Sequence, residues 1–321
     1  MATGEGKGRA FAFVGFHALC VRMPTMGSEY DLGIVIVNYN TRDLLRRCLE
    51  TVFASEGVSF RLCVVDNAST DGSAAMVARD FPQAHLIANE ENLGYPVANN
   101  QGLRAMGFEQ GQRGEARYAL LLNPDTELPP DALAKMTAFL DAHPEAGIAG
   151  PRLVRPDGSL DLACRRAFPS PEVSFYRLTG LSRLFPRSRR FGRYNLTYLP
   201  EDETAEVDSV VGAYMQVRAE AIEQVGLLDE SFFMYGEDLD WAFRVKAAGW
   251  KVYYYPEVTV LHVKRASSRR SGRAQVEFWR AMEVFYRKHY AAQTPRPVHW
   301  LIIAAIRAKL AWTQWRVGKA T

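Results

Sequence analysis

Strand and helix patterns alternate along the chain from Asp31 to His143. Short runs rich in Val, Ile and Leu end in polar residues, as buried parallel strands do, and each is followed by apolar residues at helical spacing. The expected strands are residues 31–40, 60–69, 84–90 and 117–128, and the expected helices are residues 42–55, 73–81, 98–108 and 131–143. This succession predicts an α/β fold, with a parallel sheet covered by helices on both faces. Ligands of such sheets bind beyond the carboxyl ends of the strands.

The pattern becomes less regular after Gly150. An extended hairpin and loop lead into residues 175–200, an insertion rich in Arg and aromatic residues with little periodicity. Loops of this length are often functional lids. Residues 207–226 then predict a strand and a helix, a second helix is expected to end at Gly249, and residues 251–263 predict a closing strand.

Two terminal segments stand apart from this body. Residues 1–28 hold a short apolar run without a clean small-residue cleavage site, so we expect a loosely ordered leader, or translation starting at Met23 or Met26, rather than a secretory signal. Residues 298–318 predict a helix whose apolar run is too short to span a bilayer. Its Trp residues with flanking Arg and Lys suit a membrane interface and packing on the body equally well.

Charge is distributed unevenly along the chain. From Lys264 onward there are 13 basic and two acidic residues, so this part carries +11 while the rest carries −8, for a net charge of +3. A basic tail favours an anionic partner, with a simple solvated helix as the alternative. Because no recognised nucleic-acid-binding module accompanies the tail, no nucleic-acid partner is expected.

Several classes of protein are excluded or disfavoured by missing motifs. No G-x-G-x-x-G follows the first strand and no P-loop motif occurs, which argues against a dinucleotide dehydrogenase and a P-loop NTPase. The four cysteines form no C-x-x-C pair, which argues against a disulfide scaffold or a structural zinc site and favours a reducing compartment. No stretch reaches 18 uncharged apolar residues, so a multi-span membrane protein is excluded.

Polar residues stand where the first two expected strands end. Asn38, Tyr39 and Asn40 end the first strand, and Asp66 ends the second. A carboxylate at such a position can accept the ring N–H of a pyrimidine. The alternative is that Asp66 caps the following helix through a tight turn. The strand ends therefore predict a ligand site whose chemistry the spacing alone leaves undecided.

Candidate metal ligands follow the fourth and the last expected strands. Asp125 stands beside Asn123 after the fourth strand, and a carboxylate there can hold a divalent cation that binds phosphate oxygens. The tripeptide Asn-Pro-Asp is also common in ordinary turns. His262 ends the last strand, which makes it a possible further ligand or a structural histidine.

Acidic residues cluster before the second helix of the carboxyl-terminal half. Asp229, Glu237, Asp238 and Asp240 lie within twelve residues, hemmed by Phe, Tyr and Trp side chains. Acids at a helix start are ordinary dipole partners. Their density among aromatic residues favours a partly desolvated carboxylate that can act as a general base.

The order and spacing of these motifs resemble the inverting glycosyltransferases of family 2. The matching segments are VIVNYN at 35–40, VVDNASTDGS at 64–73, ENLGYPVANNQG at 91–102, LLNPDTEL at 121–128, VVGAYMQVR at 210–218 and FFMYGEDLDWAFRVKAAGWKVYYYPEVTVLHV at 232–263. The resemblance implies the GT-A fold, a Rossmann-like mostly parallel sheet with helices on both faces, here extended by carboxyl-terminal helices.

The resemblance also implies roles on the donor side. Asp66 would bind the nucleotide base, residues 38–40 would form the rest of that pocket, and Asn92 and Gly94 would line the nucleotide-sugar site. Pro96 and Val97 follow where smaller residues are usual in the family, so the shape of the sugar pocket is expected to differ.

On the metal and acceptor side, the family position of the DxD motif is taken by Asn123 to Asp125. Asp125 would bind Mg²⁺ or Mn²⁺, with His262 as a further ligand, and Asn123 leaves the metal one anionic ligand fewer. Asp238 would be the catalytic base. The remaining acceptor-side residues implied by the resemblance are Glu237, Trp241 and Arg244.

The expected function is transfer of a sugar, with inversion, from a nucleotide diphosphate-sugar to a hydroxyl of a cell-surface glycan or a lipid-linked precursor. The closest resemblance within the family is to bacterial rhamnosyltransferases that use dTDP-rhamnose, which implies polysaccharide or cell-wall biosynthesis. UDP-galactofuranose, UDP-glucose and other donors remain open. The alternatives are a transferase acting on a soluble glycan or a protein, and a catalytically inactive nucleotide-sugar-binding scaffold.

The expected domain organisation has three parts. Residues 1–28 are the leader, residues 29–264 the glycosyltransferase domain, with halves at 29–150 and 151–264, and residues 265–321 a basic helical extension. The expected location is cytoplasmic. Peripheral contact of the extension with the inner face of the plasma membrane, where polyprenyl-linked glycans are presented, is the further possibility.

Overall fold

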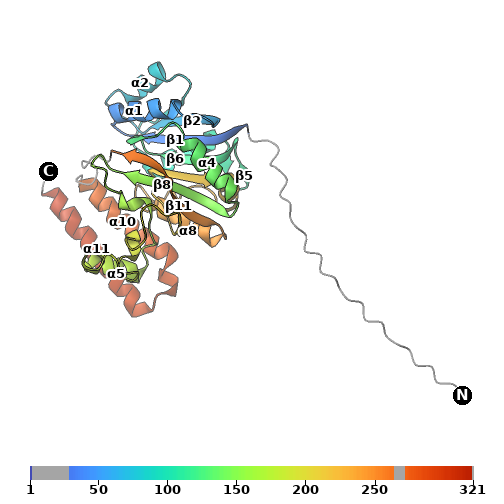
Figure 1. The fold of residues 1–321 in the computed structure, drawn as a ribbon. Coiled ribbons are helices and arrows are strands. Elements are labelled where there is room, and N and C mark those ends of the chain that lie inside the picture. Colours follow the sequence, from blue (N-terminus) through green and yellow to red (C-terminus); the bar gives the residue numbers. More distant parts are fainter. Residues whose placement is uncertain (2–28, 264–271, 320–321) are drawn as a thin grey trace.

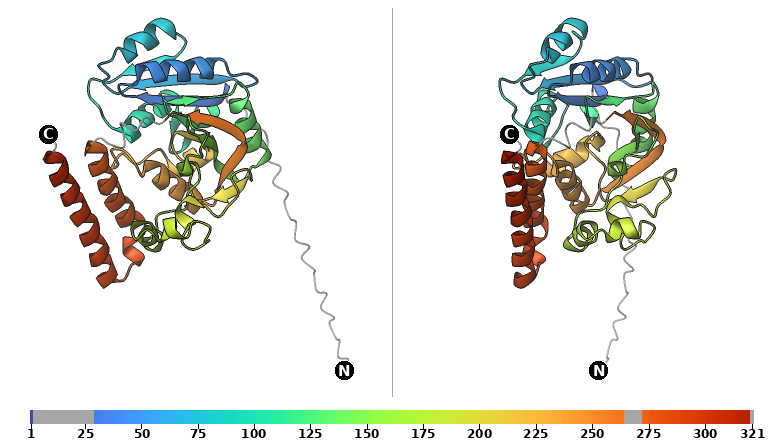
Figure 2. Two further views of the ribbon diagram at one scale, coloured as in Figure 1. Left: turned by 60° about the vertical axis from the view of Figure 1, so that its left-hand side comes forward. Right: turned by 90° about the vertical axis from the view of Figure 1, so that its left-hand side faces the viewer.

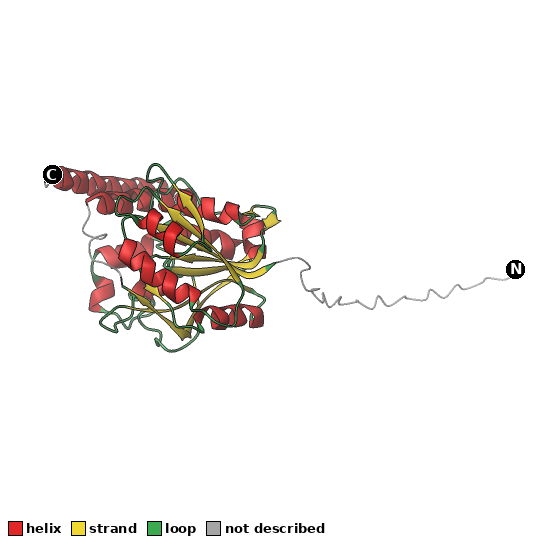
Figure 3. Cartoon of the chain, turned by 90° about the horizontal axis from the view of Figure 1, so that it is seen from above, coloured by secondary structure: helices red, strands yellow, loops and turns green. Residues whose placement is uncertain are grey.

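The computed structural model describes Met1 and residues 29–263 and 272–319, which form an α/β body with two long helices at its carboxyl end (Figure 1). The predicted leader, apart from Met1, and the beginning of the predicted extension lie outside the described residues. A nine-stranded sheet runs through the centre, with helices on both faces (Figure 3). The predicted fold class is confirmed.

The sheet runs in the order β3, β2, β1, β6, β10, β8, β11, β7, and β9 pairs with β11. The strands are β1 (Tyr30–Asn38), β2 (Phe60–Asp66), β3 (His85–Ala88), β6 (Ala116–Leu122), β7 (Thr126–Glu127), β8 (Ala146–Val154), β9 (Ala205–Val207), β10 (Tyr214–Arg218) and β11 (Lys251–His262). A separate small hairpin consists of β4 (Phe108–Glu109) and β5 (Gln112–Arg113).

Helices connect these strands in the predicted order. They are α1 (Arg42–Phe53), α2 (Ser73–Asp80), α3 (Tyr95–Ala105), α4 (Ala132–Ala142), α5 (Pro171–Leu178), α6 (Leu181–Leu184), α7 (Ala219–Val225), α8 (Glu237–Ala247), α10 (Gly272–His289) and α11 (Arg296–Gly318). Three short 3-10 turns lie at Leu162–Cys164, Arg193–Asn195 and Ala291–Gln293. Helix α8 ends as expected, since Gly249 follows it with φ of +93°.

Parallel pairing of β1, β2, β3 and β6 aligns the ends of these strands. Asn38 of β1 is paired in register with Asp66 of β2, and Ile36 with Leu122 of β6. The strand interiors are fully buried Val, Ile and Leu side chains, which belong to the main hydrophobic core. The polar residues that follow each run are therefore brought together at one edge of the sheet.

Strand β10 departs from the parallel pattern, because it runs antiparallel to both of its neighbours, β6 and β8. The sequence pattern did not predict this reversal. It follows from the long connection between β8 and β10, which returns the chain from the opposite direction. As a result the start of β10 meets the end of β6, where the backbone N–H of Asn123 donates to the carbonyl of Ala213 at 3.0 Å.

The insertion at 175–200 contains more regular structure than its sequence suggests. Helices α5 and α6 lie at its beginning, and Tyr176 of α5 is buried. The Tyr176 hydroxyl accepts a hydrogen bond from Arg190 Nε at 2.7 Å, and the guanidinium of Arg177 lies 4.1 Å from the ring centre of Tyr194. Aromatic and arginine side chains thus fold the insertion upon itself.

The carboxyl-terminal helices are arranged as two successive layers on the body (Figure 2). Ala281 and Phe285 of α10 pack against Phe232 and Leu239 of the body. Helix α11 packs on α10, where a small cluster joins its Ile303 and Ile306 to Tyr286. The helix expected at 298–318 is confirmed, and within the described ranges no helix has the length and hydropathy needed to cross a bilayer.

Candidate active site

The carboxyl ends of β1 and β2 carry a dense set of hydrogen bonds. We call these two strand ends, together with residues 89–95, the β1–β2 edge. Asn38 is buried and its Nδ2 donates to Asp66 Oδ1 at 2.8 Å. The other carboxylate oxygen of Asp66 accepts the backbone N–H of Ser69 at 2.9 Å. Asp66 is 2% exposed, so its position is fixed before any ligand arrives.

Tyr39 and Asn40 lie next to this pair but face solvent. The side chain of Tyr39 is half exposed, which leaves a ring face free for stacking. Asn40 has φ of +54°, a conformation that Asn tolerates, and its Oδ1 accepts the backbone N–H of Thr70 at 2.8 Å. The bend at Asn40 thereby connects the end of β1 to the turn before α2.

Asn67 is the centre of the amide network beyond Asp66. Its Nδ2 donates to Asn92 Oδ1 at 2.9 Å, and its Oδ1 accepts from Asn89 Nδ2 at 3.1 Å. Gly94 has φ of +89°, and a Cβ there would lie 2.6 Å from the carbonyl oxygen of Phe233. Only glycine permits this close approach, so the predicted donor-side residues Asn92 and Gly94 are held against the acceptor half.

Tyr95 joins the two halves of the site. Its hydroxyl lies 3.2 Å from Asn123 Oδ1 and 2.9 Å from the carbonyl oxygen of Gly212. The backbone N–H of Gly212 in turn donates to Asp238 Oδ2 at 3.2 Å. The candidate metal motif and the candidate base are thus connected through two residues.

Asp125 and His262 face each other across β7 and the end of β11. His262 Nε2 lies 3.3 Å from Asp125 Oδ1, and its Nδ1 lies 3.0 Å from Asp161 Oδ2. Burial lowers the pKa of the His262 imidazole, but the hydrogen bonds and charges of the two aspartates outweigh burial and raise this pKa above its ordinary value.

These residues fit a divalent cation as a partial ligand set. Carboxylate oxygens suit Mg²⁺ and Mn²⁺, and a metal-binding histidine commonly has its second ring nitrogen held by a carboxylate, as Asp161 holds His262. Among the described residues no group of three or more such ligands occurs. Phosphate oxygens of the substrate and water would complete the coordination, as is usual for Mg²⁺.

The acidic pair at the start of α8 is divided into two environments. Asp238 Oδ2 accepts from Arg166 Nη2 at 2.7 Å in a buried ion pair. Burial lowers the pKa of the Arg166 guanidinium, but the neighbouring Asp238 and Tyr194 outweigh it and raise the pKa. The adjacent Glu237 is buried with its Oε2 lacking a hydrogen-bond partner among the described residues.

Glu237 therefore lies in a different environment from Asp238. Burial and the nearby charge of Asp238 raise the pKa of Glu237 to about 8. The Nε of Arg166 is also buried without a partner among the described residues. Buried polar atoms without partners are rare in folded proteins, and a catalytic role or a bound water or ion is a usual explanation. A donor and an acceptor beside the candidate base suit the hydroxyl groups of a sugar.

Two of the predicted acceptor-side residues, Trp241 and Arg244, make contacts within the body of the protein. Trp241 is fully buried in the main core and its Nε1 donates to the carbonyl of Gly226 at 2.9 Å. Arg244 binds Asp240 and the carbonyl oxygens that precede the loop to α8. These contacts hold α8 in place, and the acceptor-side role of Trp241 and Arg244 stays a prediction.

Sequence reasoning missed Arg166, Asp161 and Tyr95, each of which touches a predicted site residue. Arg166 and Asp161 lie in the irregular segment after β8, where no periodicity fixes direction. Tyr95 stands in the NLGY motif, where the sequence pattern alone does not show which distant residues its hydroxyl contacts. A buried aspartate needs a partner, which is the signal that could have led to a search for an arginine.

Solved structures of similar fold are glycosyltransferases of the GT-A type. The mannosyltransferase PcManGT from Pyrobaculum calidifontis, solved with GDP-Man and Mn²⁺, has a TM-score of 0.53 at 17% identity, covering 92% of this chain and 77% of that one. S. aureus TarS residues 1–349 give 0.53 at 13% identity, covering 91% and 73%. This chain spans 43% of the longer TarS chain.

The sequence matches glycosyl transferase family 2 over residues 33–200 and glycosyl transferase family group 2 over residues 118–314. The chain belongs to glycosyl transferase family 2 and is a glycosyltransferase. It is 28% identical over 275 residues to an N-acetylglucosaminyl-diphospho-decaprenol L-rhamnosyltransferase of Mycobacterium tuberculosis, covering 84% of this chain and 89% of the relative. It is 23% identical to the dTDP-rhamnosyl transferase RfbF of Shigella flexneri, covering 86% and 84%.

Proposed function

We propose that this chain transfers rhamnose from dTDP-rhamnose, with inversion and with a divalent cation, to a sugar hydroxyl carried on a polyprenyl diphosphate. The names of the two rhamnosyltransferase relatives support the donor and the acceptor class. The observation that carries the proposal is the hydrogen-bonded linkage from Asn123 through Tyr95 and Gly212 to Asp238, which supports a base and a metal site that act on the same substrate.

Asp238 is suited to accept the proton of the attacking hydroxyl. Its Oδ2 is occupied by Arg166 and Gly212, whereas Oδ1 accepts only the N–H of Leu239 in the described residues and keeps a lone pair. General-base assistance of this kind contributes roughly 10²–10⁴ in rate. With one base and no carboxylate assigned as nucleophile, direct displacement and hence inversion follows.

Asp125 and His262 would hold the cation, which supplies positive charge to the departing diphosphate when bound. The raised pKa of His262 means that the ring is protonated at higher pH than usual, and a ligand imidazole must be neutral. Cation affinity is therefore expected to rise with pH as His262 loses its proton. Asp161 would keep the ring oriented for that exchange.

The base of the nucleotide would lie at the β1–β2 edge. Asp66 would accept the ring N–H of thymine, and the exposed ring of Tyr39 would stack on the base. Residues 38–40, Asn92 and Gly94 would surround the nucleotide-sugar. Because Asp66 is already held by Asn38 and Ser69, little ordering is needed upon binding.

Membrane contact through the outer helices belongs to the same proposal. Most of the exposed large apolar side chains in the described residues lie on or beside α5, α6, α10 and α11. On α11, the Lys309 Nζ lies 5.6 Å and the Arg316 guanidinium carbon 4.9 Å from the ring centre of Trp312. Exposed Trp residues with adjacent cations suit the lipid head-group region at the inner face of a plasma membrane.

The test is direct transfer with purified protein. The assay combines Mn²⁺, an N-acetylglucosaminyl-diphosphate acceptor on a prenyl chain, and dTDP-rhamnose, UDP-galactofuranose or UDP-glucose in parallel. We expect product only with dTDP-rhamnose, loss of product with EDTA, and an anomeric configuration opposite to that of the donor by NMR. Transfer from another donor would overturn the rhamnosyl assignment. Binding of dTDP without any transfer would instead support the inactive scaffold.

A further inference from the structure

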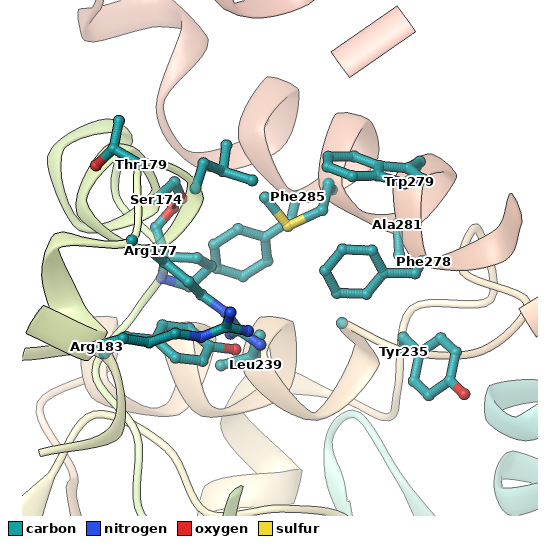
Figure 4. A pocket seen from close by; sticks show the side chains of 16 residues that line it. Ser174, Arg177, Thr179, Arg183, Tyr235, Leu239, Phe278, Trp279, Ala281 and Phe285 are labelled. Carbon is teal, nitrogen blue, oxygen red and sulfur yellow. Dashed lines mark hydrogen bonds between the residues drawn. The ribbon is translucent and has the colours of Figure 1, made fainter. Parts of the chain in front are cut away.

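A cavity of about 410 Å³ lies outside the sheet edge, between α5–α6 and α10 (Figure 4). This volume is within the range of roughly 300–1,000 Å³ that is common for small-molecule pockets. Phe278, Trp279 and Phe285 of α10 form one wall, and α5 and α6 form the opposite one, while Leu239 of α8 lies at the base. We call it the α5–α10 cavity.

Two arginines give the apolar cavity a cationic side. Arg177 and Arg183 line it from α5 and α6, and both are exposed. Neither has a carboxylate partner among the described residues, whereas Arg190 of the same insertion pairs with Glu172. Arginines without acidic partners beside an aromatic wall suit a ligand that is phosphorylated at one end and hydrocarbon at the other.

The cavity adjoins the start of α8, the helix that carries the candidate base. Gly236 lines the cavity and is the residue directly before Glu237 and Asp238. Tyr194 also lines it, stacks on Arg177, and neighbours Arg166, the ion-pair partner of Asp238. Asp238 itself does not line the cavity, but residues on both sides of it in the chain, Gly236 and Leu239, do.

The outer side of the cavity continues into exposed apolar surface. Leu178 lines the cavity and is 63% exposed, and Phe175 on the same helix is 58% exposed. Phe278 at the opposite wall is 37% exposed. A hydrocarbon chain that is too long for the cavity would leave it over these side chains and not through polar surface.

Resting on the proposed function, we propose that the α5–α10 cavity binds the lipid part of the acceptor: the isoprenoid units nearest the phosphate lie between α5 and α10, and Arg177 and Arg183 bind the diphosphate. A soluble glycan is disfavoured as the occupant, because the aromatic wall offers it few hydrogen-bond partners. The size of the cavity limits it to the beginning of a long prenyl chain. The site thus selects the lipid carrier separately from the sugar that reacts.

The experiment compares two acceptors that differ only in the lipid. N-acetylglucosaminyl diphosphate is linked to farnesol or to a methyl group, and KM and kcat are measured for each with dTDP-rhamnose. The wild-type protein is expected to show a KM for the farnesyl acceptor at least about tenfold lower, which corresponds to about 1.4 kcal/mol of apolar contact. Transfer to neither acceptor would count against the proposed function; equal KM values for both would overturn the cavity assignment alone.

Variants separate the two parts of the site. Met282→Trp, which fills the cavity from α10, should raise KM for the farnesyl acceptor and leave the methyl acceptor unchanged. Arg177→Ala combined with Arg183→Ala should raise KM for both acceptors by at least about tenfold, since both carry the diphosphate. Arg187→Ala is the matched control, because Arg187 is an exposed arginine of the insertion that does not line the cavity. An equal effect of Arg187→Ala would overturn the assignment of the arginines.

A binding measurement tests the cavity in variants that have lost transfer activity for reasons unrelated to lipid binding. Farnesyl diphosphate and inorganic diphosphate are titrated separately into each protein, and the melting temperature is followed. Stabilisation by farnesyl diphosphate at concentrations where inorganic diphosphate has no effect, lost in Met282→Trp, is the expected result. If Met282→Trp keeps that stabilisation, or if both compounds act equally, the proposal is wrong.

Discussion

The β1–β2 edge and the α5–α10 side of the molecule satisfy their polar groups in opposite ways. At the β1–β2 edge, Asn38, Asp66 and Asn67 bind one another and their neighbours, so the donor region is ordered by its own side chains. On the other side, Glu237 Oε2 and Arg166 Nε are buried without partners in the described part of the chain. The proposed nucleotide site is therefore ordered by its own hydrogen bonds, whereas the proposed acceptor side keeps buried polar atoms without partners in the described residues.

Apolar exposure follows the same division. The β1–β2 edge offers only Tyr39 as an exposed large apolar side chain, whereas Phe175, Leu178 and Leu184 are exposed on α5–α6 and several Trp residues on α11. Monomeric soluble domains rarely gather such side chains in one region without a partner. The comparison teaches that the proposed donor site is formed by the ends of the sheet strands, while the proposed acceptor site is formed by a cavity and an apolar surface that lie outside the sheet.

The largest expected effect comes from removing the candidate base. Asp238→Asn keeps the size of the side chain but cannot accept the hydroxyl proton, so transfer should fall by roughly 10²–10⁴ while dTDP binding is retained. Steady-state kinetics and dTDP titration measure the two quantities. Asp229→Asn is the control, since Asp229 lies in the loop before α8 and pairs with Lys288 instead. Near-normal transfer by Asp238→Asn would show that the base is a different group.

The next largest effect is expected at the β1–β2 edge, on nucleotide binding and not on the acceptor. Asp66→Asn removes the charge that is held by Asn38 and Ser69, and we expect the Kd for dTDP to rise roughly tenfold to a hundredfold, given about 1.5–3 kcal/mol for a hydrogen bond to a charged group. Isothermal titration checks this. Asp71→Asn serves as the matched variant because Asp71 also accepts backbone N–H groups, from Arg42 and Ser73, at the start of α2. Equal losses in both variants would mean that Asp66 acts only through the fold.

A smaller effect is expected on the outer helix. Replacing Trp312 and Trp315 by Ser removes exposed aromatic side chains without touching Ile303 and Ile306, which pack on α10. Binding to vesicles containing anionic lipid should weaken by about an order of magnitude, with an unchanged melting temperature. Gln314→Ser, at another exposed position of α11, is the control. Unaltered vesicle sedimentation of the double variant would remove α11 from the membrane proposal.

The sequence predicted the donor half better than the acceptor half, for a physical reason. Strands β1, β2 and β6 are buried on both faces, so their apolar runs and polar ends are unambiguous, and Asn38 and Asp66 were placed correctly side by side. The antiparallel direction of β10 and the ion pair of Arg166 with Asp238 depend on contacts between distant segments. No local periodicity records such contacts.

The orientation of α8 shows the limit most clearly. The acidic density in this segment predicted a desolvated carboxylate, and Glu237 and Asp238 are both buried. The sequence did not show that Trp241 is buried in the core or that Asp238 pairs with Arg166. Both contacts depend on how α8 packs against distant segments of the chain.

The last effect, on stability and not on transfer, concerns Glu237 and pH. Its pKa is raised from 4.5 to about 8 by burial and by Asp238, so the folded state keeps a proton that the unfolded chain releases. The folded state therefore loses stability as pH rises from the unfolded value of 4.5 toward about 8, by at most about 1.4 kcal/mol per pH unit. Glu237→Gln stays neutral and should not show this loss.

Urea denaturation of both proteins at several pH values in that window tests this expectation. The difference in unfolding free energy should shift in favour of the Gln variant as pH rises. This shift should be smaller when a sugar acceptor is bound whose hydroxyl donates a hydrogen bond to Glu237 Oε2, because such a bond stabilises the charged form of Glu237. A pH-independent difference would mean that Glu237 ionises normally, and the acceptor side would then be as complete as the β1–β2 edge.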